Sequence, residues 1–230
     1  MWDRRHFSVD FGAMDQAKTV KEISPSAYSL DRFSSLPIEM KSYIISFLNV
    51  EEAVKTSVLS KTWRNMWTTM PHIQFDSSFG SSKAQFVTLV DLALSLHEGS
   101  LVSFSIKGRG SYHDELYRWM YMLSRKKPSD ITIKLKSEQY YMIPSCLFNI
   151  RDLEGLNLRF CIVTLPQMFE GFKRLQVLKP RRFSSTDAGI NSLISSCPLL
   201  DILVLKYFKG ISCLNIQAQV LRLLEAFGRP

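Results

Sequence analysis

Cysteine is scarce in this chain, and its four cysteines form neither a zinc-binding nor a disulfide pattern. They stand at wide, irregular intervals, without a C-x-x-C pair and without a histidine at zinc-ligand spacing. We therefore expect reduced, buried thiols, and no metal or other cofactor. The four are Cys146, Cys161, Cys197 and Cys213.

Long hydrophobic runs and a secretory leader are also lacking. The longest nearly apolar run, Phe86 to Leu96, is too short to cross a bilayer and is interrupted by Asp91. The first residues alternate charges with isolated aromatics and have no continuous apolar stretch. We therefore expect no membrane association, and a protein of the cytoplasm, the nucleus or both.

Glycine and proline are few, at 10 and 9 of 230 residues, which excludes fibrous and low-complexity proteins. With 46% hydrophobic residues, the chain can bury a sizeable core in one or two domains. Residues 1–30 show no sustained apolar period, and we predict a flexible tail there.

The net charge of +8 raises the hypothesis of a basic nucleic-acid-binding protein, whose affinity would fall steeply with salt. The dense clusters are small, however: Arg125 to Lys127, and the cations between Lys173 and Arg182. Neither belongs to a recognised nucleic-acid-binding motif. We interpret them as solvated faces, which argues against a nucleic-acid partner.

Catalytic motifs are not found either. The four histidines, His6, His72, His97 and His113, stand apart, and no H-E-x-x-H, G-x-S-x-G or phosphate-binding glycine loop occurs. The polar residues from His113 to Glu115 are adjacent in the sequence, but adjacency alone does not indicate a catalytic site. The sequence therefore predicts no catalytic residue and a protein that is not an enzyme.

Three helix-start signals follow one another between residues 34 and 71. In the first, Ser34 or Ser35 can cap a helix that has Pro37 in its first turn and runs to about Leu48. Met40, Ile44, Ile45, Phe47 and Leu48 share one face of this helix, while Glu39, Lys41 and Ser42 face away.

The second and third signals predict two further short helices. Asn49 and Glu52 have the spacing of a capping box, and the apolar residues from Val50 to Val58 recur at helical intervals. Ser60 can cap a third helix, which places Trp63 and Trp67 on one face and ends before Pro71.

Three short helices cannot bury this many large side chains among themselves without metal, disulfides or a partner. The segment contains no cysteine and no pattern of metal ligands. Although an apolar helical stripe is more often intramolecular core than interface, the excess here predicts a docking partner.

A spaced leucine pattern follows farther along the chain. The segment from Leu153 to Cys161 fits the leucine-rich repeat template L-x-x-L-x-L-x-x-N/C, and similar blocks begin at Leu175, Leu200 and Leu221. Their steps of 22, 25 and 21 residues suit such repeats. The predicted structural positions are Leu153, Leu156, Leu158, Cys161, Leu175, Leu178, Leu200, Leu203 and Leu205.

Two alternating segments, Ser103 to Lys107 and Ile131 to Lys136, are predicted to be earlier, degenerate rungs of the same solenoid. The cysteine in the turn, Cys161, is interpreted as structural, and so are Cys197 and Cys213.

The segment from Asp31 to Trp67 resembles the F-box of the plant F-box and leucine-rich repeat family of the FBD type. The matching pieces are Leu36-Pro37, the I-I-S-F-L block, the A-V-K-T-S-V-L-S-K run and W-R-N-M-W. The phrase from Ser192 to Leu205 resembles the same family. Ile38, Met40 and Thr62 depart from its usual pattern without placing a charge in the apolar stripe.

This resemblance implies a module that docks a Skp-type adaptor and, through it, a cullin-RING ubiquitin ligase. The residues implied to contact the adaptor are Leu36, Pro37, Ile44, Leu48, Val54, Val58, Leu59 and Trp63, with Trp63 weighted as largely structural. The chain would then be the substrate-recognition subunit that binds an unknown target protein through its repeats. The alternative is a truncated F-box protein that occupies the adaptor without presenting a target.

We therefore predict a mixed α/β fold with an N-terminal three-helix F-box and a partial leucine-rich repeat solenoid. The expected boundaries are a tail over 1–30, the F-box over 31–76, a linker with a helix over 77–100 and an incomplete repeat region over 101–230.

Overall fold

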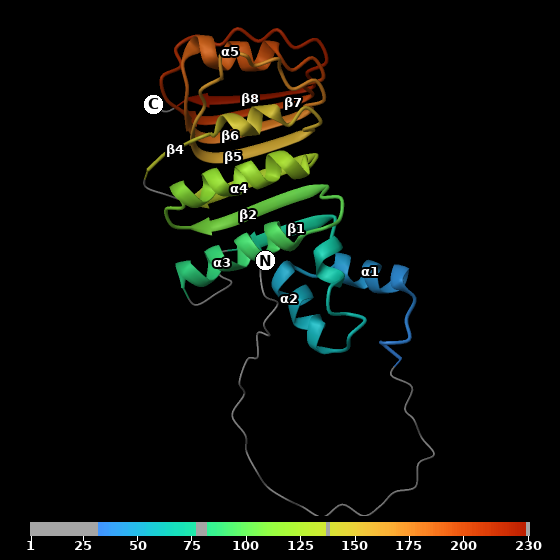
Figure 1. The fold of residues 1–230 in the computed structure, drawn as a ribbon. Coiled ribbons are helices and arrows are strands. Elements are labelled where there is room, and N and C mark those ends of the chain that lie inside the picture. Colours follow the sequence, from blue (N-terminus) through green and yellow to red (C-terminus); the bar gives the residue numbers. More distant parts are fainter. Residues whose placement is uncertain (1–31, 77–81, 137–138, 229–230) are drawn as a thin grey trace, which may run out of the picture.

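The computed structural model describes residues 32–76, 82–136 and 139–228, and it shows a small helical module at one end of a stacked parallel sheet (Figure 1). The tail predicted for residues 1–30 lies outside the described residues, as do residues 77–81 at the start of the predicted linker. The mixed α/β fold predicted from the sequence is confirmed.

The helical module contains fewer full helices than its sequence suggests. It consists of α1 (Ile38–Ser46), α2 (Val50–Lys55) and two 3-10 helices, η1 (Thr56–Val58) and η2 (Met66–Thr69). The third α-helix predicted from Ser60 is wrong, because the chain forms turns there before η2. The hydroxyls of Thr68 and Thr69 donate to the carbonyls of Asn65 and Met66, and such local bonds compete with a regular helix.

The starts of the two helices also differ in how they are capped. The capping box of α2 is confirmed, with the Glu52 amide 2.9 Å from Asn49 Oδ1 and the Asn49 amide 3.1 Å from Glu52 Oε2. At α1 the predicted serine cap is wrong. Pro37 itself occupies the N-cap position, and Ser35 Oγ instead donates to the carbonyl of Arg32.

The solenoid is an eight-stranded parallel sheet in which, β4 apart, neighbouring strands follow one another along the chain. The two degenerate rungs predicted before residue 140 are confirmed as β2 and β3. The order is β1-β2-β3-β5-β6-β7-β8, with β4 paired to β5. The strands are β1 (His72–Asp76), β2 (Ser103–Arg109), β3 (Asp130–Lys136), β4 (Tyr141–Met142), β5 (Gly155–Ile162), β6 (Val177–Ser184), β7 (Ile202–Phe208) and β8 (Leu223–Gly228).

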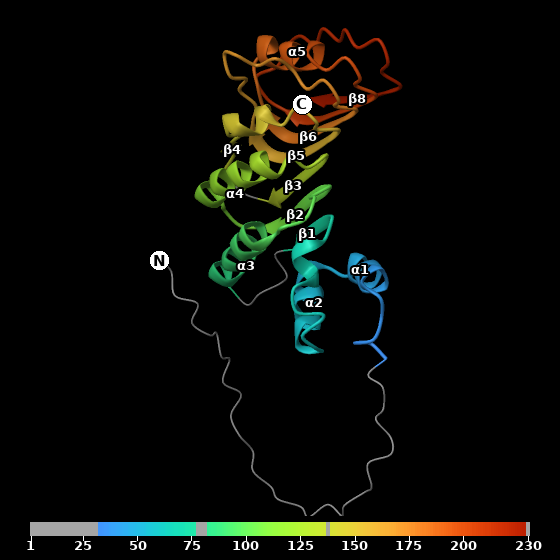
Figure 2. The ribbon, with the colours of Figure 1, turned by 45° about the vertical axis from the view of Figure 1, so that its right-hand side comes forward.

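Return segments cover one face of this sheet, as Figure 2 shows for the helices. They include α3 (Lys83–Leu96), α4 (His113–Lys126), η3 (Ser145–Asn149) and α5 (Asp187–Ser195). The helix expected in the linker is α3, which packs against α4 and contributes to the solenoid core. No helix among the described residues covers the opposite, outward face of the sheet.

The core is built from equivalent positions of successive strands. Leu156, Leu178, Leu203 and Leu224 are paired across β5, β6, β7 and β8, and the same row continues back to β1. Each fully buried aliphatic side chain contributes about 1.5–3 kcal/mol. All members of the row except Leu224 are buried: Ile73, Phe104, Ile131, Leu156, Leu178 and Leu203.

A backbone irregularity recurs at one repeat position. Phe160, Arg182 and Tyr207 have positive φ angles of 59°, 49° and 58°, and they stand side by side on β5, β6 and β7. At each of these positions the strand has one extra residue, so that the next side chain points into the core again. On β5, for example, Leu158 and Cys161 are both buried, with two residues between them. For this reason the interval between core positions in the repeat template changes from two residues, Leu156 to Leu158, to three residues, Leu158 to Cys161.

The helical module is packed directly onto the first strands. Val50 of α2 belongs to the solenoid core, and the Glu98 amide donates to the carbonyl of Thr68 over 2.9 Å. Near this bond, the His97 ring nitrogen Nε2 lies 2.9 Å from the carbonyl oxygen of Met70. The sheet thus begins at β1, within the range expected for the F-box.

Candidate functional site

The helical module has a small core and a large apolar surface. Four buried hydrophobic residues form its own core: Ile45, Ala53, Trp63 and Met70. Seven large hydrophobic side chains are exposed instead: Phe33, Ile38, Met40, Tyr43, Phe47, Val58 and Leu59. The described part of the module therefore presents more large apolar side chains to solvent than it buries.

The residues predicted to contact an adaptor fall into three groups in the structure. Val58 and Leu59 are open to solvent, with exposed fractions of 87% and 57%, and Pro37 is also exposed. Leu36, Ile44 and Leu48 are half-buried against the small core, whereas Val54 is half-buried against the solenoid core.

Trp63 differs from the other predicted contact residues, because its side chain is only 1% exposed. Its indole Nε1 donates to the carbonyl of Phe33 over 3.3 Å. Trp63 is therefore a core residue of the module. A role in adaptor binding would be indirect, through the surface residues that its side chain holds in place.

Lys41 corrects the predicted orientation of α1, since the sequence pattern placed it on the solvent side. Its side chain is buried, and Nζ donates to the carbonyl of Ser34 over 2.9 Å and to Oγ1 of Thr62 over 3.1 Å. Conversely, Met40 and Phe47 of the predicted apolar stripe are exposed. The ring of Phe47 packs edge-on against Tyr43, with centroids 4.8 Å apart, and this pair was not among the predicted contacts.

A second surface lies on the outward face of the sheet, and we did not predict it from the sequence. Five successive strands carry a cation at the same register position: Lys107, Lys134, Arg159, Arg181 and Lys206, here named the basic row. Lys134 and Arg159 directly follow the paired residues Ile133 and Leu158. Each cation stands three residues after the aligned core residue of its strand, so aligning the repeats would have revealed the row.

The cysteines and histidines in the described part of the chain form no metal centre. Among the described residues, no group of three or more His, Cys, Asp or Glu side chains could hold a metal ion. Burial raises the pKa of the Cys161 thiol well above its usual range and raises the pKa of Cys197 to about 11, so both thiols stay protonated. No helix in the described part of the chain is long and apolar enough to span a membrane.

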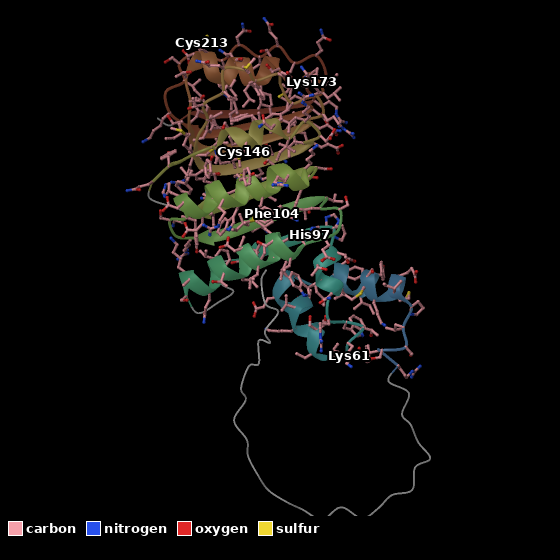
Figure 3. The ribbon with its side chains drawn as sticks, in the orientation of Figure 1. Lys61, His97, Phe104, Cys146, Lys173 and Cys213 are labelled. Carbon is pink, nitrogen blue, oxygen red and sulfur yellow. The ribbon has the colours of Figure 1, made fainter. Side chains whose placement is uncertain are left out.

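Cys213 corrects the expectation of a buried thiol, because it lies exposed at the surface of the solenoid (Figure 3). Its backbone is held from α5: the amide donates to Asp187 Oδ1 over 3.1 Å, and the carbonyl accepts from Asn191 Nδ2 over 3.2 Å. The segment between β7 and β8 contains no helix, so its pattern did not indicate which side chains turn inward.

These features define the class of protein: a small helical module joined to a leucine-rich repeat solenoid. The F-box domain family matches residues 33–74, and the family described as "FBD-associated F-box protein At5g56370, LRR repeats" matches residues 116–228.

Related proteins occur in Arabidopsis thaliana. The F-box/FBD/LRR-repeat protein At1g13570 is 33% identical over 87% of this chain and 50% of its own length. The F-box/LRR-repeat protein At4g14103 is 31% identical over 77% of this chain and 50% of its own length. The chain belongs to this family of F-box proteins with leucine-rich repeats, and it spans about half the length of these two relatives.

Proposed function

We propose that this chain is the substrate-recognition subunit of an SCF-type ubiquitin ligase, in which the F-box binds a Skp-type adaptor and the repeats bind a target protein. The observation that carries the proposal is the apolar surface of the F-box, where seven large side chains are exposed around a core of four. An apolar excess on so small a unit is typical of a surface that docks against another polypeptide.

The proposed role needs no catalytic side chain in this chain. A receptor accelerates modification by holding a lysine of the target near the ubiquitin thioester carried by another subunit, which raises their effective concentration. The direct packing of α2 and β1 supports this role, because a rigid connection fixes the distance between the adaptor and the repeat surface.

The test is co-expression with a Skp-type adaptor, comparing wild type with Val58→Asp and Leu59→Asp. Both side chains are exposed, so the substitutions should leave the fold intact while placing a charge in the proposed interface. We expect both variants to lose most of the co-purifying adaptor, because burying an unpaired carboxylate is costly.

A matched control is Met168→Asp, in the segment between β5 and β6, where the native side chain is 92% exposed. It introduces the same charge far from the F-box and should retain the adaptor. If Val58→Asp and Leu59→Asp co-purify with as much adaptor as Met168→Asp does, the proposed interface is wrong.

A further inference from the structure

The basic row concentrates positive charge on the uncovered face of the sheet. Neighbouring strands of a sheet are about 4.8 Å apart, so the five cations of the row extend over roughly 19 Å. Lys179 lies beside them, two residues before Arg181 on β6. Of the row's five members, only Lys206 forms an ion pair with another described residue, Glu225.

The cations of the row act on one another. Partial burial lowers the pKa of Lys134, and the charges of Lys107, Arg181, Lys179 and Arg159 lower it further. Like charges that face each other on adjacent strands are destabilising. The free protein thus maintains an unfavourable arrangement that an anionic ligand would relieve.

Cations lie over aromatic rings next to the row. The Arg182 guanidinium carbon lies 5.3 Å from the ring centre of Phe160 and 5.6 Å from that of Tyr207, and Arg159 lies 5.2 Å from Phe160. Lys209 similarly lies 5.7 Å from the ring centre of Tyr140.

This arrangement distinguishes between two kinds of anionic ligand. Single-stranded nucleic acids bind by stacking bases on free aromatic faces, and here a cation lies over at least one face of each ring. A guanidinium stacked on a ring still directs its N–H donors toward an anion, and it pairs well with carboxylate oxygens. The surface therefore favours carboxylates over nucleobases.

One carboxylate already binds at the row. Glu225 of β8 accepts a hydrogen bond from Lys206, and this bond, with the charges of Lys206, Arg181 and Lys179, lowers the pKa of Glu225. The positions flanking the row do not continue its charge, since β1 carries Asp76 and β8 carries Phe227 in the aligned positions.

We propose that the basic row binds an extended, acidic segment of a protein, whose aspartate or glutamate side chains pair with Lys134, Arg159 and Arg181. The inference rests on the proposed function, because it names the class of target that the repeat surface recognises. At about 3.3 Å per residue, roughly six extended residues span the row.

The experiment measures binding of fluorescent probes to the whole chain by anisotropy. One probe is an eight-residue peptide that alternates glutamate and serine, the second replaces each glutamate by glutamine, and the third is an eight-nucleotide oligouridylate. We expect only the glutamate peptide to bind appreciably, with an affinity that falls as salt rises. Equal binding of the glutamine peptide, or tighter binding of the oligouridylate, would overturn the proposal.

The variants separate the row from the overall positive charge. The triple variant Lys134→Gln, Arg159→Gln and Arg181→Gln should bind the glutamate peptide about tenfold more weakly, because several exposed charge pairs each contribute modestly. The control Arg125→Gln, Lys127→Asn and Lys173→Gln removes the same charge away from the row and should bind as wild type does. Equal losses in the two variants would show that net charge alone attracts the peptide, which contradicts the site.

Two further measurements keep the outcome interpretable. Arg181→Gln alone, at an exposed position, should weaken binding a few-fold without affecting folding, and circular dichroism checks the fold of each variant. A wild-type chain that co-purifies with the adaptor but ignores the peptide would refute the acidic ligand and leave the receptor role standing. A chain that binds the peptide but never the adaptor would refute the receptor role instead.

Discussion

Lys41 donates a hydrogen bond from Nζ to Oγ1 of Thr62 over 3.1 Å, and so ties α1 to the turn that precedes η2. The same ammonium group donates to the carbonyl of Ser34 and lies 5.9 Å from the ring centre of Trp63. A buried ammonium group is tolerated only where such partners replace its water, and here they connect three segments of the F-box.

Replacing this ammonium group should weaken the F-box. We expect Lys41→Met, which keeps the length of the side chain, to lower the free energy of unfolding by about 1–3 kcal/mol, because the hydrogen-bond partners of Nζ lose a charged donor. Urea unfolding followed by tryptophan fluorescence would measure the change. Lys55→Met is the matched control, since Lys55 is exposed and pairs with Glu51 one turn away, and it should have little effect.

Lys41 also illustrates which features of the F-box could be predicted from sequence. Its charge led us to place it on the solvent side, although Lys41 and Ile45, four positions apart, share the buried face of α1. Its hydrogen-bond partners come from residues outside that helix, which a periodic pattern does not describe. The capping box at Asn49 was predictable because its two hydrogen bonds join residues three positions apart. In place of the α-helix expected after Ser60, the chain forms turns and η2, whose backbone amides, as in Trp63 to Ser60 and Met66 to Trp63, bond three residues back.

The solenoid was easier to predict than its surface. A repeated leucine spacing indicates strands because each repeat must stack on its neighbours to bury its core. The basic row depends on the register between strands, which the order of residues within one strand does not contain. Lys107 and Arg181 stand 74 positions apart in the sequence but belong to the same row.

The register of the core row predicts a strong contrast between two leucines. Leu203 is 0% exposed, whereas its register partner Leu224 is 49% exposed. We expect Leu203→Ala to lower the free energy of unfolding by about 2–5 kcal/mol, because it leaves a cavity. The same change at Leu224 should cost about 1 kcal/mol or less. Thermal unfolding of the two variants compares them directly, and similar losses would contradict the observed burial.

His97 lies at the junction between the F-box and the solenoid (Figure 3), where its Nε2 is 2.9 Å from the carbonyl oxygen of Met70, and we expect it to make the stability of this junction depend on pH. Burial lowers the pKa of His97 below its ordinary value of 6.5, and the nearby charge of Lys126 lowers it further, while the hydrogen bond to Met70 acts in the opposite direction. In the folded protein the ring is therefore neutral over a wider pH range than in the unfolded chain.

The direction of the pH effect follows from this lowered pKa. Below a pH of about 6.5 the unfolded chain binds a proton that the folded chain resists, so stability falls as the pH decreases until the folded ring also becomes protonated. Unfolding by urea between pH 7.5 and pH 5.5, values chosen as about one unit on either side of the ordinary pKa, should show this loss in wild type. In His97→Gln the loss should shrink. An unchanged pH dependence in that variant would assign the effect to another group.

The crowding within the basic row predicts that removing a charge can stabilise the protein. Lys134 faces Lys107 across β2 and β3, so we expect Lys134→Gln to raise the free energy of unfolding by a few tenths to about 1 kcal/mol. Added salt should stabilise wild type more than this variant, because the repulsion is already reduced in the variant.

The control is Arg125→Gln, which removes a charge from the last turn of α4, where a cation favours the helix, and it should not raise the free energy of unfolding. Thermal unfolding at low and high salt tests both variants, and a loss of stability in Lys134→Gln would mean that the charges of the row are compensated in the free protein.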